Sequence, residues 1–194
     1  MRKITTPLTE EVISSLNVGD TVLLSGQIVT ARDAAHKLMV EEKPEFIRPY
    51  LKDGVIYHCG PVVKQDTHSG EWTFISAGPT TSTREEPYQS TVIKEYGVRA
   101  VIGKGGMGEK TLAGLKENCA VYLHAVGGSG TVTASKVKRV KDVFMMEEFG
   151  SPEAFWVIEV EDFPVIVTMD SKGNSLHKNI LDLSKNVCKQ LLEK

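Results

Sequence analysis

Hydrophobic and polar residues in the first half of the chain alternate between a helical and a strand-like spacing. Residues 9–16 predict a short helix for which Thr9 is a suitable N-cap. Residues 21–30 form a β-rich run with Gly26 inside it, as where a strand bulges or backbones approach closely. The same pattern predicts a helix over residues 32–42, a strand over 55–59, a polar connection over 64–71 and a strand over 72–77.

Helical and strand-like segments alternate through the middle of the chain, which favours parallel strands with helices packed on the sheet. Strand-like segments then follow one another before a closing amphipathic helix over residues 175–192. No repeat or domain boundary interrupts the sequence, so we expect one α/β domain over residues 1–194. Its sheet should be mixed, partly parallel and flanked by helices. The other predicted helices are residues 86–96 and 110–117, and the other predicted strands are residues 98–102, 120–125, 132–140, 155–160 and 163–169.

Composition and charge exclude several functional classes. The 194 residues are 41% hydrophobic and 25% charged, with a formal net charge of -2, which argues against a protein built to grip nucleic acid. The basic stretch at residues 136–141 alternates polar and apolar side chains, as a half-exposed strand does. No apolar run is long enough for a membrane span or a signal peptide. We therefore expect no membrane association and a cytoplasmic location.

The cysteines do not form a recognisable metal or disulfide motif. Cys59, Cys119 and Cys188 are far apart in the sequence, and their number is odd. An iron–sulfur cluster with four irons usually takes at least three thiolates at motif spacing. We therefore expect no metal site in this chain and interpret the cysteines as small hydrophobic residues.

A first candidate for chemistry lies where a predicted strand runs into a helix. Arg32 stands at this junction and points towards the crevice where α/β sheets bind ligands. Its planar guanidinium suits a carboxylate, although a surface pair with Asp33 is an alternative. His36 follows one helical turn later on the same face, a position typical of a packed or solvent-facing histidine.

Two further segments combine glycine, hydroxyl and cationic residues after predicted strands. Residues 77–84 place Thr80, Thr81 and Arg84 before a helix, where they form an anion site. The alternative is that Ser82 or Thr83 caps the helix and Arg84 is exposed. Residues 101–108 contain four glycines around Lys104 and lack the order of a Walker loop. This loop either binds an anion or corresponds to the I-G-x-x-G loop of RNA-binding KH domains, which joins two helices.

Arg32, Arg84 and Lys104 would repel one another around a single crevice unless an anion neutralised them. A dicarboxylate would do so. The sequence therefore predicts a small dicarboxylate ligand, provided that the fold brings the three cations together.

These segments, in this order, resemble the β subunit, or C-terminal domain, of class I fumarases and L-tartrate dehydratases. Glu85 departs from the family pattern, in which methionine is expected after the arginine. The matching stretches are SGQIVTARDAAHK (25–37), YHCGPV (57–62), SAGPTTSTR (76–84), VIGKGGM (101–107) and FPVIVTMDSKGNSL (163–176).

The resemblance implies a mobile α/β domain of the swivelling type and the reversible hydration of fumarate to L-malate, with L-tartrate or mesaconate as alternative substrates. It further implies that a partner α subunit holds a 4Fe–4S cluster, so that the enzyme is a hetero-oligomer. Arg32, Arg84 and Lys104 would bind the substrate carboxylates. Thr80 would either remove the proton or only orient the substrate while a group of the partner subunit moves the proton. The supporting positions would be Asp33, which would hold Arg32, together with His36, Thr81, Gly103 and Gly105.

Overall fold

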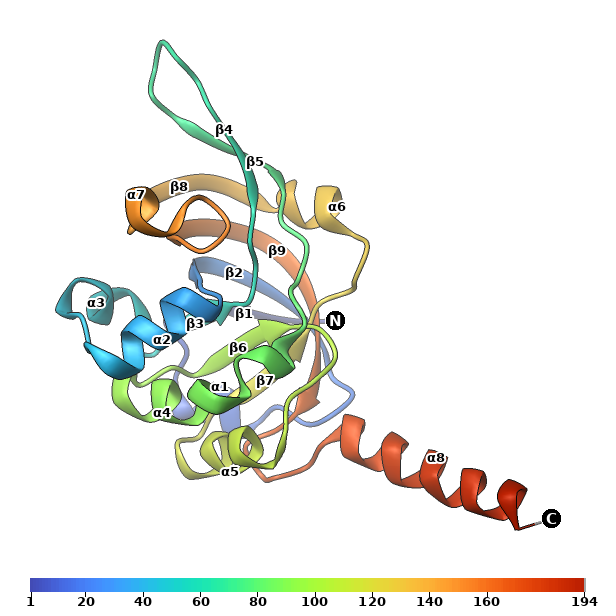
Figure 1. Cartoon of the computed structure of the whole chain (residues 1–194). Helices are drawn as coiled ribbons and strands as arrows, with labels where there is room; N and C mark the ends of the chain where they lie inside the picture. Colours follow the sequence, from blue (N-terminus) through green and yellow to red (C-terminus); the bar gives the residue numbers. More distant parts are fainter. Residues whose placement is uncertain (194) are drawn as a thin grey trace.

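The computed structural model describes residues 1–193, and most of its strands form one seven-stranded sheet (Figure 1). A separate two-stranded hairpin, β4 (Val62–Gln65) and β5 (Trp72–Ser76), projects from the body of the protein. In spatial order, the large sheet contains β1 (Arg2–Thr5), β2 (Thr21–Thr30), β3 (Val55–Tyr57), β6 (Ala100–Gly103), β7 (Val121–His124), β9 (Phe155–Met169) and β8 (Val137–Phe144).

Five strands of the large sheet close into a ring. Strands β2, β3, β6 and β7 pair in parallel, and the long strand β9 runs antiparallel to its neighbours. Strand β9 also pairs with β2, from Thr21 opposite Ile166 to Thr30 opposite Trp156, with a bulge beside Gly26. The mixed, partly parallel sheet and the predicted α/β class are therefore confirmed.

Alternate residues of the parallel strands supply two hydrophobic cores. Ile28, Tyr57 and Ile102 belong to one core, whereas their neighbours Val29 and Val101 belong to the other. This division follows from the two-residue period of a strand. The second core is completed by α2 (Asp33–Glu41), α4 (Glu86–Tyr96) and α5 (Glu109–Glu117), which cover the sheet. The remaining α-helices are α1 (Glu10–Ser14), α3 (Arg48–Leu51), α6 (Gly130–Ala134), α7 (Met146–Phe149) and α8 (Leu176–Leu192).

The structure corrects the sequence-based expectation in three places. Residues 132–140 are not one strand, since helix α6 ends at Ala134 and β8 begins at Val137. The two strands expected over residues 155–169 are the single strand β9. Strand β4 occupies the start of the segment interpreted as a polar connection. Apart from these three places, the short elements β1, α3 and α7 were not expected.

Helix α8 confirms the closing amphipathic helix, yet its apolar face is exposed. Ser175 caps it by accepting a hydrogen bond from the backbone N–H of Lys178. The helix projects away from the body of the protein (Figure 1). Its apolar side chains are therefore largely exposed: Ile180, Leu183, Val187 and Leu191.

Candidate functional site

The carboxyl ends of parallel strands bring the predicted cationic residues to one edge of the sheet. Strand β2 ends at Thr30 just before Arg32, and β6 ends at Gly103 just before Lys104. Strand β3 lies between them and is followed by His58. This is the edge at which α/β sheets usually bind ligands.

The Thr80–Arg84 loop lies against the ends of β3 and β6. The backbone N–H of Thr80 donates to the carbonyl of His58 at 2.7 Å. The backbone of Lys104 donates to the Thr80 carbonyl at 3.2 Å and accepts from the N–H of Ser82 at 3.0 Å. Thr81 and Lys104 also form an isolated β-bridge. The backbone thus fixes Thr80 beside Lys104, as the predicted site requires, and both residues are half-buried.

Arg32 is held by a different carboxylate from the one expected. Its Nε lies 3.3 Å from Oε1 of Glu153, and Oε2 of Glu153 accepts the Ala34 N–H at 3.0 Å. The Arg32 side chain crosses the backbone of Gly60, where an added Cβ would lie 2.3 Å from its Nη1. Asp33 forms its ion pair with Arg84, so the expected pairing of Asp33 with Arg32 is wrong.

The ion pair between Arg84 and Asp33 joins the N-terminus of α2 to the 3₁₀ turn Ser82–Arg84. The Arg84 side chain is 55% exposed, which leaves it accessible to a ligand from solvent. Partial burial favours the neutral form of Asp33. Hydrogen bonding to Glu85 and Arg84 outweighs that effect and holds its pKa below the usual value. Asp33 is therefore a stable anionic partner for Arg84.

Below this edge, buried polar side chains form a continuous network. The Gln89 amide lies between two imidazoles, 3.0 Å from His36 Nε2 and 2.7 Å from His58 Nε2. His58 Nδ1 is 2.8 Å from the Ser82 hydroxyl, to which the Tyr122 O–H donates at 2.8 Å. All five side chains are fully buried. The network links α2, β3, the Ser82 turn, α4 and β7.

The two histidines of the network are neutral. Burial lowers the pKa of both histidines. The pKa of His58 lies well below its usual value, because the neighbouring His36 ring adds to the effect of burial. A neutral imidazole carries one N–H, and His36 uses it at Nδ1 to donate to the Arg32 carbonyl at 2.9 Å. Its Nε2 is therefore an acceptor, so the NH₂ end of Gln89 must face it. His36 is thus the packed histidine of the sequence-based alternatives, and it fixes the backbone of Arg32.

Gly103 makes this arrangement possible because it packs closely against the network. A Cβ at this position would lie 1.8 Å from the Ser82 hydroxyl oxygen and 3.0 Å from that of Tyr122. Gly105 and the following Gly106 have positive φ angles of 81° and 76°, which glycine adopts without strain. The loop joins strand β6 to helix α5, whereas a KH loop joins two helices. The KH alternative is therefore wrong for this loop.

We predict that Gly103→Ala destabilises the fold by about 3 kcal/mol, because the new methyl group displaces the buried Ser82 hydroxyl. Denaturant unfolding measures this change. Gly78→Ala is the matched control, since its Cβ would meet only the Gly130 Cα at 3.7 Å. Equal stability of the two variants would show that the packing around Ser82 is not tight.

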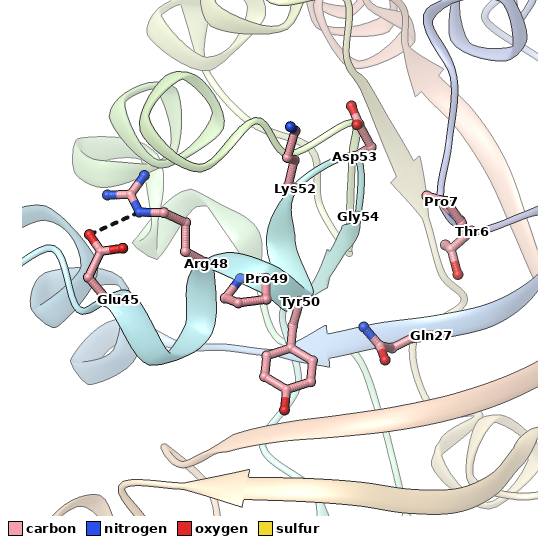
Figure 2. Close-up of a pocket in the computed structure, with 10 residues that line it drawn as sticks. All are labelled: Thr6, Pro7, Gln27, Glu45, Arg48, Pro49, Tyr50, Lys52, Asp53 and Gly54. Atoms are coloured by element: carbon pink, nitrogen blue, oxygen red, sulfur yellow. Dashed lines mark hydrogen bonds and ion pairs between the residues drawn. The ribbon is translucent and has the colours of Figure 1, made fainter.

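A cavity of about 540 Å³ lies elsewhere and contains none of the predicted site residues (Figure 2). It is lined by parts of β2 and α3 and by the segments beside them. Most of its charged side chains are engaged within the protein: Arg48 pairs with Glu45, and Asp53 pairs with Arg99. Paired charges of this kind stabilise the local structure and offer little to an anionic ligand.

Cysteine chemistry does not fit an iron–sulfur site in this chain. Cys59 is buried, which raises the pKa of its thiol to about 12 and keeps it protonated. Cys119 and Cys188 lie at the surface, wholly or in part. Within residues 1–193, no group of three or more histidine, cysteine or carboxylate side chains could hold a metal ion. Over the same residues, no helix is long and apolar enough to cross a membrane.

In a comparison with known protein families, residues 2–180 of this chain match the family described as Fumarase C-terminus. The chain belongs to this family. A putative class I fumarate hydratase from Geobacillus stearothermophilus is 51% identical over 174 residues, or 90% of this chain, and the chain spans 33% of that relative. The putative L(+)-tartrate dehydratase subunit beta of Methanocaldococcus jannaschii is 41% identical, and the alignment covers 96% of this chain and 94% of the relative. The L(+)-tartrate dehydratase subunit beta of Escherichia coli K12 is 38% identical over 91% of this chain and 87% of its own length.

Within the Fumarase C-terminus family, this chain aligns with proteins named L(+)-tartrate dehydratase subunit beta and with a third of a putative class I fumarate hydratase. Sequence reasoning missed several residues that build its candidate site, namely His58, Ser82, Gln89, Tyr122 and Glu153. His58 and Ser82 were signalled, since they lie within the YHCGPV and SAGPTTSTR stretches that carry the resemblance. The other three come from segments that gave no chemical motif.

Proposed function

We propose that this chain is the β subunit of a two-subunit hydro-lyase that reversibly hydrates fumarate to L-malate. Arg32, Arg84 and Lys104 bind the two carboxylates of the substrate, and Thr80 acts beside them in proton transfer. The partner α subunit supplies the 4Fe–4S cluster, for which this chain has no fitting ligands within residues 1–193. The assembly is a hetero-oligomer located in the cytoplasm.

The arrangement at the carboxyl edge of the sheet carries this proposal. Three cationic side chains come from separate segments, and backbone hydrogen bonds fix Thr80 next to Lys104. Guanidinium groups bind carboxylates through paired N–H donors, and an ammonium adds a point charge. Two arginines and a lysine thus match a small molecule with a carboxylate at each end.

The role of Thr80 follows from its neighbours. A threonine hydroxyl is a poor base unless nearby positive charge lowers its pKa. Lys104 is adjacent through the backbone, and Arg84 closes the same loop. We therefore propose that the positive charges of Lys104 and Arg84 lower the pKa of the Thr80 hydroxyl, so that Thr80 exchanges a proton with C3 of the substrate.

Two relatives support different substrates. Sequence identity is higher to the putative fumarate hydratase, at 51%, which favours fumarate. The 41% identity to a putative L(+)-tartrate dehydratase subunit beta supports tartrate. L-tartrate is therefore the second candidate, and mesaconate the third.

Anaerobic co-purification with an α partner, followed by parallel assays of fumarate, L-tartrate and mesaconate, tests this proposal. We expect hydration of fumarate by the assembled enzyme and none by the β chain alone. Preference for L-tartrate would establish the second candidate. Full activity of the purified chain without iron would contradict the two-subunit proposal.

A further inference from the structure

A fully buried carboxyl group lies beside the ion pair of Arg84 with Asp33. Glu85 ends the Ser82–Arg84 turn and precedes α4, and its side chain has no exposed surface. Both of its carboxyl oxygens and Oδ1 of Asp33 are buried and receive no N–H or O–H donor from residues 1–193. The Glu85 and Asp33 carboxyl groups lie within hydrogen-bonding reach of each other. Two carboxyl groups in contact contain acceptors only, unless one of them carries a proton.

We propose that Glu85 is a protonated positioning residue, which donates its O–H to Asp33 and thereby fixes the carboxylate that holds Arg84. Oδ2 of Asp33 accepts from Nη2 of Arg84, so one proton on Glu85 satisfies the remaining oxygen of Asp33. The relay would orient the Arg84 guanidinium towards the substrate carboxylate. This inference rests on the proposed function and adds a residue to its site.

The charged and titratable groups around Glu85 explain why it keeps its proton. From α2, the anionic Asp33 faces it, and from the end of β3, Nδ1 of His58 lies 4.0 Å from its Oε2. Tyr122 on β7 is also near, but its hydroxyl donates to Ser82. His58 is neutral and Arg84 is engaged by Asp33, so neither fully compensates a second buried carboxylate. Burial has the larger effect and the neighbouring Asp33 the smaller one, and together they raise the pKa of Glu85 to about 8.

Ionisation of Glu85 would break this relay. Above its pKa, two carboxylates without an intervening proton repel each other, and Asp33 shifts away from its position under Arg84. Substrate affinity then falls while the reacting groups remain in place. The expected signature is an increase in KM with pH, larger than any change in kcat.

The test uses the assembled enzyme with Glu85→Gln, Glu85→Leu and the surface control Glu41→Gln, which is 58% exposed. From about pH 7 to about pH 9, we expect the KM of the wild type and of the control to increase about tenfold. The amide introduced by Glu85→Gln donates an N–H to Asp33 at every pH, so this variant should lack that increase. Glu85→Leu keeps a filled core without a donor and should show a KM about tenfold higher already at pH 7. Identical pH profiles for Glu85→Gln and the wild type would overturn the proposal.

A second readout separates this inference from the proposed function. In the full chain without its partner, infrared difference spectra between the wild type and Glu85→Gln should show a protonated carboxyl band at about pH 7 that disappears above about pH 8. A band absent at about pH 7 would overturn the inference whether or not the enzyme hydrates fumarate. A band present in this chain, together with an assembled enzyme that has no hydro-lyase activity, would overturn the proposed function and leave the protonated Glu85 in place.

Discussion

Replacing Arg84 with alanine is expected to lower kcat/KM for the dicarboxylate by about 100- to 1000-fold. The Arg84 side chain is 55% exposed, so it contributes little to the core, and its removal should leave the fold intact. The loss arises because one substrate carboxylate enters the site without its bidentate partner. Steady-state kinetics of the assembled enzyme measures this effect.

Arg139 provides a matched control for that experiment. It is also exposed, at 66%, and its Nε is paired with Oε2 of Glu159 on the neighbouring strand β9. Arg139→Ala removes the same side chain and a comparable ion pair at a distance from the candidate site. Normal kinetics for Arg139→Ala with a large loss for Arg84→Ala assigns the effect to the site. Unchanged kinetics for Arg84→Ala would remove Arg84 from the substrate-binding residues.

The sequence predicted those elements whose local signals agree with their packing. Helix α4 begins at Glu86 and ends at Tyr96 as expected, because a proline lies in its first turn and Gly97 adopts the left-handed conformation after its end. Strand β2 likewise spans Thr21–Thr30, where β-branched residues dominate. In both elements the local preference matches the tertiary structure.

The failures come from segments whose local pattern is ambiguous. Glu161 and Asp162 interrupt β9 with two charges, and the positive φ of Asp162 resembles a turn, yet pairing with β2 continues on both sides. Thr131 and Thr133 in α6 are β-branched and favour a strand locally. The Thr133 hydroxyl instead donates to the Ala77 carbonyl at 2.7 Å, a contact over 56 positions. No local pattern reveals such a long-range contact.

The candidate site likewise contains residues that the sequence predicted and residues that it did not. Strand ends followed by Arg32 and Lys104 could be predicted, because parallel strands place their carboxyl ends at one edge. The ion-pair partner of each cation could not be predicted, since Glu153 reaches Arg32 from a segment about 120 positions away. In the sequence, Glu85 is only a departure from the family pattern. The structure shows that the Glu85 carboxyl is buried against the Asp33 carboxyl, which no sequence pattern indicates.

That burial leads to a large expected effect on stability. Glu85→Gln should become progressively more stable than the wild type as the pH increases from 4.5, the usual pKa of a glutamate, to about 8, its pKa in the fold. The unfolded chain releases the Glu85 proton near the lower value, whereas the folded chain retains it up to the higher one. The folded state therefore binds more protons across this window, and the stability of the wild type declines as pH increases.

The difference in unfolding free energy between Glu85→Gln and the wild type should grow by about 1.4 kcal/mol per pH unit, to a total of about 5 kcal/mol, and then level off. Urea titrations of both proteins between about pH 5 and about pH 9 measure it, and the exposed control Glu41→Gln should show no such slope. Titrating groups that do not contact Glu85 behave alike in the variant and the wild type, so their contributions cancel. A constant difference across this range would mean that Glu85 ionises as an ordinary surface glutamate does, which its complete burial beside Asp33 makes physically costly.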